Sequence, residues 1–136
     1  MQQASVTWVE GEQFRAVGPS GHAVVMDGDR ERNTGPGPME LLLLALGGCT
    51  GSDVVSILRK KRQQLTALEI RVEGERAPEP PMVWTRLKVH YRVVGRQLDP
   101  RAVEHAIELS RSKYCSVAAT LGRTATIEWS HSLEEA

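Results

Sequence analysis

The chain contains two cysteines, and both lie in segments that must be buried. Cys49 falls mid-way along an apolar stretch, 38–58, and Cys115 lies at the joint between two later helical patterns. Buried thiols either fill space or meet for redox chemistry, in which one cysteine reacts and the other resolves it. Cys115 precedes the first turn of a short helix, where backbone N–H dipoles lower a thiol pKa. The residues alone leave both interpretations open.

Glu40, in the first turn of the long apolar helix, is the second candidate for chemistry. Its carboxylate either interacts with the helix dipole or acts as a base or orienting group for a thiol. On one straight helix, Glu40 and Cys49 are about 13 Å apart along the axis and on roughly opposite sides. We therefore expect Glu40 to reach a thiol only through substrate, through Cys115 or across a dimer.

No other residue pattern indicates a cofactor or metal. The sequence has no glycine-rich phosphate loop, no nucleophile elbow and no dinucleotide fingerprint, so no cofactor is expected. Four histidines lie far apart without ligand spacing, and we predict no zinc or other metal site. They are His22, His90, His105 and His131.

Length and charge indicate one ordinary globular domain, 1–136. Seventeen basic residues balance seventeen acidic ones, so the chain has no net positive charge to attract nucleic acid or an anionic membrane. The N-terminus lacks the features of a signal peptide, and the apolar run 41–46 is too short to cross a bilayer. We therefore expect a cytoplasmic protein, in which thiols stay reduced and a disulfide is transient and catalytic rather than structural.

The alternation of apolar and polar residues predicts several strands. An N-terminal antiparallel meander is followed by a glycine- and proline-rich loop over 27–38. A later hairpin is joined through 77–81, and a last strand ends the chain. The predicted strands are 6–9, 13–17, 22–26, 68–75, 84–94 and 124–129.

Three helices complete the predicted order. The major helix covers 38–64 and is apolar on every face in its first half, so a second subunit is expected to cover it. Gly47 and Gly48 predict the close approach of another helix beside Cys49. Asp99 caps a second helix, and the third covers 116–121. The fold class is α+β, with antiparallel sheets packed around a buried central helix.

The stretch Gly37-Pro-Met-Glu-Leu-Leu-Leu-Leu-Ala-Leu-Gly-Gly-Cys-Thr50, joined to Tyr114-Cys-Ser-Val117, resembles the OsmC and organic-hydroperoxide-resistance family. The order of elements is also similar, so the resemblance covers nearly the whole chain. It implies a bacterial, cytosolic, intertwined homodimer of the antioxidant stress response. It further implies that Cys49 attacks a hydroperoxide, that Cys115 resolves it as a disulfide, and that a dithiol such as dihydrolipoamide reduces the protein again.

The sequence departs from the peroxidase branches of that family at two places. Their catalytic glutamate directly follows the proline, whereas here Met39 follows it and Glu40 comes one residue later. One residue along a helix turns the side chain by about 100° around the axis. Their N-terminal hairpin turn carries an arginine, and the turn 18–22 has none. A bare carboxylate raises the pKa of a thiol, so Glu40 can assist only by anchoring a cation. The candidate cations are Arg15, Arg30 and Arg32.

The predicted function is reduction of hydroperoxides, preferably organic ones, by the cysteine pair. Apolar walls from 41–46 favour an organic substrate. Attack gives a sulfenic acid at Cys49, which condenses with Cys115. The alternative is a non-enzymatic module that binds a small apolar ligand, or senses oxidation, at a dimer interface. Loss of free thiols after one equivalent of an organic hydroperoxide distinguishes the two.

Overall fold

The computed structural model describes all residues, 1–136, and the chain divides into two compact units. The first is Met1–Leu42 and the second is Leu43–Ala136. The long helix α1 (Pro38–Lys60) begins in the first unit and continues into the second.

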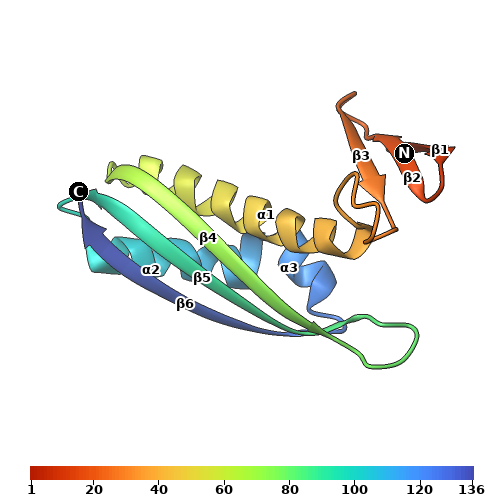
Figure 1. Ribbon diagram of the computed structural model, residues 1–136. Helices are drawn as coiled ribbons and strands as arrows, with labels where there is room; N and C mark the ends of the chain where they lie inside the picture. The colour runs from red at the N-terminus through yellow and green to blue at the C-terminus, as the bar shows by residue number, and fades with distance from the viewer. The chain divides into compact units, whose positions relative to one another are not determined.

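The first unit is built on the predicted antiparallel meander (Figure 1). Its three strands are β1 (Ser5–Glu10), β2 (Gln13–Val17) and β3 (Ala23–Asp27). Each strand pairs with the next in the chain. Several large apolar side chains of this sheet are exposed, including Trp8 at 65% and Val6 at 55%. A single copy of the chain therefore leaves this small sheet without a complete core.

The loop between β3 and α1 is held by its own polar groups. The buried Asp27 carboxylate accepts hydrogen bonds from the Thr34 side chain and from the backbone N–H groups of Thr34 and Asp29. The Thr34 hydroxyl, first, and the Asp29 N–H hold the pKa of Asp27 below its usual range. The Arg30 guanidinium donates to the carbonyls of Asp27 and Gly35. These bonds fix the segment that leads into α1.

Helix α1 ends at Lys60, four residues earlier than predicted. Arg62 takes a left-handed conformation, with φ of 57°. The N–H of Gln63 donates to the carbonyl of Leu58, and that of Arg62 donates to Arg59. This is the Schellman arrangement that usually requires glycine, and no glycine marked it in the sequence.

One stripe of α1 is buried within the chain. It consists of residues four apart, which lie on one face of a helix: Leu46, Thr50, Val54 and Leu58. The rest is only partly covered, and Leu44 is 62% exposed. By length and composition alone the helix could cross a membrane, with a mean hydropathy of 1.8. This is weak evidence, because core helices of globular proteins pass the same test.

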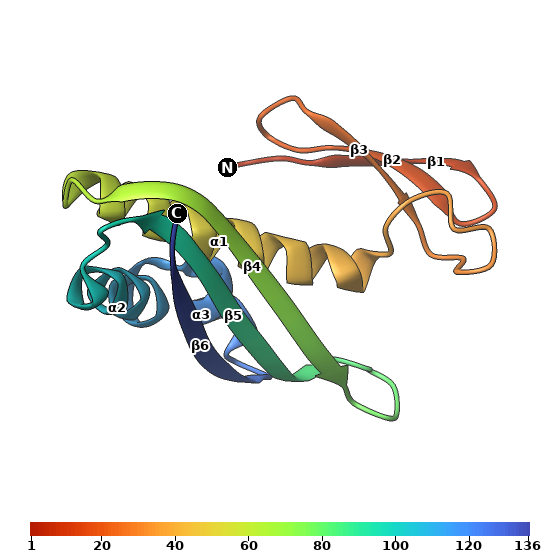
Figure 2. The same ribbon diagram turned by 60° about the vertical axis from the view of Figure 1, so that its left-hand side comes forward.

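The second unit is a three-stranded sheet covered by helices (Figure 2). Its strands are β4 (Gln64–Arg76), β5 (Trp84–Arg96) and β6 (Thr126–Glu135), in that order. The predicted hairpin of β4 and β5 is antiparallel, as expected, although all three strands are longer than predicted. The inward face of β5 is fully buried and supplies much of the core: Leu87, Val89, Tyr91 and Val93.

The pairing of β6 with β5 is parallel, which corrects the prediction of antiparallel sheets only. Parallel neighbours need a long crossover connection. That connection consists of α2 (Pro100–Leu109), a π-helical turn η1 (Ser110–Tyr114) and α3 (Ser116–Leu121). Asp99 caps α2 as predicted, by accepting a hydrogen bond from the N–H of Arg101. The crossover brings residues far along the chain to α1.

Candidate redox site

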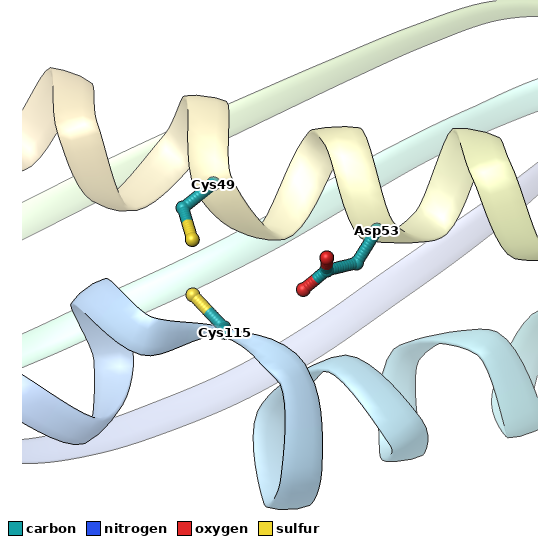
Figure 3. A group of neighbouring side chains, drawn as sticks. All are labelled: Cys49, Asp53 and Cys115. Carbon is teal, nitrogen blue, oxygen red and sulfur yellow. The ribbon is translucent and has the colours of Figure 1, made fainter.

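The two cysteines meet in the second unit, together with an aspartate. Cys49 and Asp53 come from α1, and Cys115 comes from the joint between η1 and α3 (Figure 3). The two sulfur atoms and a carboxylate oxygen all lie within 4.8 Å of one another. Both cysteines are free thiols; Cys115 is buried and Cys49 is partly exposed. The structure thus brings together the two thiols that the sequence analysis singled out.

Helix α1 places Cys49 and Asp53 on the same side because they are four residues apart. A neighbouring row of glycines faces β4 instead. A Cβ atom on Gly51 would lie 2.9 Å from Ile70, and one on Gly47 would lie 3.5 Å from Val72. The glycines therefore allow α1 to approach a strand. Gly47 faces β4 and not the helix that was expected there, and a Cβ on Gly48 would meet no atom of this chain within 4 Å.

Cys115 is positioned by the irregular turn that precedes it. Its N–H donates to the carbonyl of Ser110, five residues back, at 2.8 Å. This π-type bond ends η1, and Cys115 itself has extended backbone angles and caps α3. Its sulfur accepts a hydrogen bond from the N–H of Ala118 at 3.4 Å. The π-helical turn was not predicted, although π turns often occur at functional sites.

Burial makes Cys115 a poor nucleophile at neutral pH. Desolvation, followed by a hydrogen bond with Cys49 and the charges of Cys49 and Asp53, raises the pKa of Cys115 to about 11. The hydrogen bond from the N–H of Ala118 lowers this pKa, but by less than the other causes together raise it. The prediction that the helix N-terminus lowers this pKa is therefore wrong, because the loss of water outweighs one backbone donor. Cys115 stays protonated at pH 7.

A buried chain of hydroxyl groups ends at the Asp53 carboxylate. Tyr91 and Thr50 share a hydrogen bond of 2.6 Å, and Thr50 and Ser110 share one of 2.7 Å. The Ser110 hydroxyl donates to Oδ2 of Asp53 at 2.8 Å. The three hydroxyl residues are fully buried, so each hydrogen bond has little competition from water. The chain fixes the Asp53 carboxylate beside the thiols.

An open groove of about 410 Å³ borders the cluster, and Asp53 forms part of its wall. Tyr114, next to Cys115 in the chain, lines the same groove and is half exposed. Lys60, Lys61 and His105 supply its polar rim. Small molecules and ions can therefore reach the Asp53 side of the cluster from solvent.

Glu40 belongs to the first unit, where Arg30 binds it. Arg30 Nη1 lies 3.1 Å from Glu40 Oε1, and the same oxygen accepts the N–H of Gly37 at 2.6 Å. Glu40 thus occupies the third position of α1 and reaches back to the residue before Pro38, which is one half of a capping box. Of the three candidate cations, Arg30 binds Glu40 and Arg32 instead pairs with Glu10 at 2.9 Å.

Asp53 is the site residue that the sequence analysis missed. Its signal was the spacing of four residues from Cys49, which places both on one helix face. The hydroxyls that orient it gave no signal, because Tyr91 and Ser110 lie 41 and 60 positions from Thr50.

Comparison with known proteins agrees with this architecture. The family model for OsmC-like proteins matches residues 28–130. Protein YhfA of Escherichia coli K12 is 44% identical over 129 residues, covering 95% of this chain and 96% of its own. A hypothetical protein from Aquifex aeolicus VF5 has a similar structure, with a TM-score of 0.89 at 28% identity, covering 100% of this chain and 98% of its own.

A more distant structural neighbour carries a functional description. It is an organic hydroperoxide resistance protein OsmC of Legionella pneumophila, also described as a predicted redox protein and regulator of sulfide bond formation. Its TM-score is 0.67 at 14% identity, covering 97% of this chain and 96% of its own. At that identity the likeness concerns the fold alone. The family match and the similarity to YhfA show more: the chain belongs to the family of OsmC-like proteins.

Proposed function

We propose that this protein is a thiol peroxidase that reduces organic hydroperoxides with Cys49 and Cys115. The observation that carries the proposal is the meeting of two free thiols, 66 positions apart in the chain, within 4.8 Å. A disulfide needs a sulfur separation of about 2.05 Å, so the two sulfurs must approach each other by at most about 2.8 Å to form it. The hydroperoxide resistance proteins with this fold add support by analogy.

Exposure and burial suit the two thiols to different roles. We propose that Cys49, which is partly exposed, attacks the peroxide as a thiolate, whereas Cys115 is protonated when the peroxide arrives because burial raises its pKa to about 11. Its sulfur takes the distal oxygen of the hydroperoxide, the O–O bond breaks, and the alkoxide leaves and takes up a proton. Cys49 is then a sulfenic acid. The Cys115 sulfur attacks that sulfenic sulfur, and the products are the disulfide and one water molecule.

Asp53 handles a proton in the second step. The Cys115 thiol must lose its proton as it attacks, and the hydroxyl of the sulfenic acid must gain one to leave as water. The Asp53 carboxylate lies beside both sulfurs and is held by Ser110. We propose that it accepts the proton from Cys115 and delivers it to the leaving oxygen.

Glu40 stays a proposed site residue for the first step. A carboxylate can assist a thiolate only by anchoring a cation, and Arg30 is bound to the Glu40 carboxylate. A guanidinium supported in this way stabilises a thiolate and the alkoxide that leaves. Substitution of either partner tests this role.

We further propose a homodimer that works in the cytoplasm. The exposed Leu42 and Leu44 of α1 and the exposed Trp8, Val24 and Val25 of the first sheet are too apolar to face water in a stable protein. A second copy would cover them. A cellular dithiol, dihydrolipoamide by family resemblance, would reduce the disulfide and close the cycle.

The thiol count decides between catalysis and simple binding. Reduced protein is mixed with one equivalent of cumene hydroperoxide, and free thiols are counted over time. Fast loss of two thiols per chain, with one alcohol formed, supports the peroxidase. Slow loss, or loss of a single thiol, would favour the non-enzymatic ligand-binding or sensing module. Hydrogen peroxide in a parallel sample measures the preference for organic substrates.

A further inference from the structure

We propose that the reduced protein binds one thiophilic divalent metal ion, with zinc as the best fit, through Cys49, Cys115 and Asp53. The sequence predicted no metal site, because the histidines lack ligand spacing. The tertiary structure instead assembles two sulfurs and a carboxylate oxygen within 4.8 Å of one another. This inference does not depend on peroxidase activity, since it concerns the reduced thiols alone.

The separation of the three ligand atoms suits a tetrahedral ion. Zinc binds sulfur at about 2.3 Å and carboxylate oxygen at about 2.0 Å, so adjacent sulfurs of a tetrahedral site lie about 3.8 Å apart. The corresponding sulfur–oxygen separation is about 3.5 Å, so a cluster whose ligand atoms are all within 4.8 Å needs a contraction of about 1.3 Å at most. In Figure 3 the three side chains point into one shared space between α1 and the segment at Cys115. Rotation about side-chain bonds can supply that contraction.

The ligands also have the outer hydrogen bonds that metal sites require. A coordinating carboxylate is normally held by a further donor, and Ser110 donates to Asp53 at 2.8 Å. Thr50 in turn fixes Ser110. Backbone N–H groups commonly support coordinated sulfur, and that of Ala118 lies 3.4 Å from the Cys115 sulfur. These bonds hold the Asp53 carboxylate and the Cys115 sulfur in place.

The ligand set selects the class of metal. Two sulfurs exclude magnesium and calcium, which take oxygen ligands, and favour zinc and other borderline or soft ions. Zinc replaces the proton of a coordinating thiol, so binding releases protons and overcomes the burial that keeps Cys115 protonated. Three protein ligands leave the fourth tetrahedral position open. The groove that Asp53 lines connects the cluster with solvent.

Cobalt(II) is the probe of choice, because thiolate coordination gives it charge-transfer absorption in the near ultraviolet and tetrahedral geometry gives it intense visible bands. Full-length reduced protein, stripped with a chelator and kept free of oxygen, is titrated with cobalt and then with zinc. We expect one cobalt per chain with two thiolate ligands, displaced by one equivalent of zinc. Zinc should also protect both thiols of the wild type from alkylation.

Variants test the individual ligands. Cys115→Ser should halve the charge-transfer intensity, and Asp53→Asn should weaken zinc binding about 10- to 100-fold. Glu104→Gln, which removes an exposed carboxylate of α2, is the matched control and should bind like the wild type. Circular dichroism confirms that each variant is folded. The absence of charge-transfer bands, no protection of the wild-type thiols, or unchanged zinc affinity in folded Asp53→Asn would overturn the proposal.

Discussion

The two carboxylates of α1 that could do chemistry have very different surroundings. Glu40, in the first turn, pairs with Arg30, and the two side chains are 48% and 52% exposed. Asp53, thirteen residues later, lies beside two thiols and ends a chain of fully buried hydroxyls. Water screens the first pair, so it contributes up to about 1 kcal/mol to stability. The buried surroundings of Asp53 screen its charge far less than water does.

This difference shows how one helix can supply two kinds of carboxylate. The first-turn position makes Glu40 a cap and an anchor for a cation. The mid-helix position, on the side that faces the crossover, makes Asp53 a neighbour of a thiol whose charged form is disfavoured. We expect the two carboxylates to affect different steps of the proposed reaction, and the predictions below test that separation.

The largest expected effect is on the cysteines themselves. Cys49→Ser should lower peroxide consumption by at least about 1000-fold, because the thiol that remains, Cys115, is buried and protonated. Cys115→Ser should still consume one equivalent of peroxide but stop at the sulfenic acid, which a dimedone probe detects by mass. Equal sulfenic acid yields at either position would contradict the assignment of Cys49 as the attacking thiol.

Asp53→Asn should slow disulfide formation roughly 100-fold, since the proton of Cys115 loses its acceptor. The first step should be unchanged or faster, because a negative charge beside the thiolate has been removed. Stopped-flow fluorescence with one equivalent of cumene hydroperoxide separates the two phases. A slow first phase with a normal second phase would show that Asp53 acts on peroxide attack.

Alkaline pH should destabilise the protein through Tyr91. Burial, first, raises its pKa to about 12 from an ordinary value near 10. The folded state therefore holds this proton more tightly than the unfolded state, and stability is full below pH 10 and lost as pH rises toward 12. The loss amounts to roughly 2 to 3 kcal/mol.

At about pH 11 Tyr91 is half-way through this change, so urea unfolding at about pH 8 and about pH 11 should show roughly 1 to 1.5 kcal/mol of the loss. Cys115, whose pKa is about 11, contributes in the same direction at slightly lower pH. The control is Tyr91→Phe, whose stability should fall less steeply over this range. An equal decline in the control would exclude Tyr91 as the cause.

Thr50→Val should lower the free energy of unfolding by about 1 to 3 kcal/mol. The substitution keeps the shape of the side chain but leaves the buried Tyr91 hydroxyl without its partner. The double substitution of Thr50→Val with Tyr91→Phe removes both polar groups and should recover part of the loss. Urea unfolding of the single and double variants measures the coupling, and additive losses would argue against it.

The smallest effects belong to the exposed pair. Arg30→Ala and Glu40→Gln should slow oxidation of Cys49 about 10-fold and 3-fold, with the proposed dimer unchanged in sedimentation. Glu40→Gln should cost at most about 1 kcal/mol of stability, because it weakens the cap and a screened ion pair. Wild-type oxidation rates in both variants would leave Glu40 a structural residue.

The sequence by itself determined most of the local structure. The meander, the β4–β5 hairpin and the cap at Asp99 follow from alternation and capping, which depend on neighbours in the chain. The pairing of the cysteines came from the resemblance to the OsmC family. Local patterns misplaced the end of α1, because Arg62 takes the left-handed position that glycine usually marks.

Only the tertiary structure decided the surroundings of the site. The parallel pairing of β5 with β6 requires a crossover, and that crossover brings Cys115 to α1. The π-helical turn in the crossover ends directly before Cys115. That arrangement brings the Asp53 carboxylate to the thiols, which local patterns had not indicated. It also raises the pKa of Cys115, where the local helix pattern had predicted a decrease. Burial and charge depend on residues that are distant in sequence, and no local pattern encodes their distance in space.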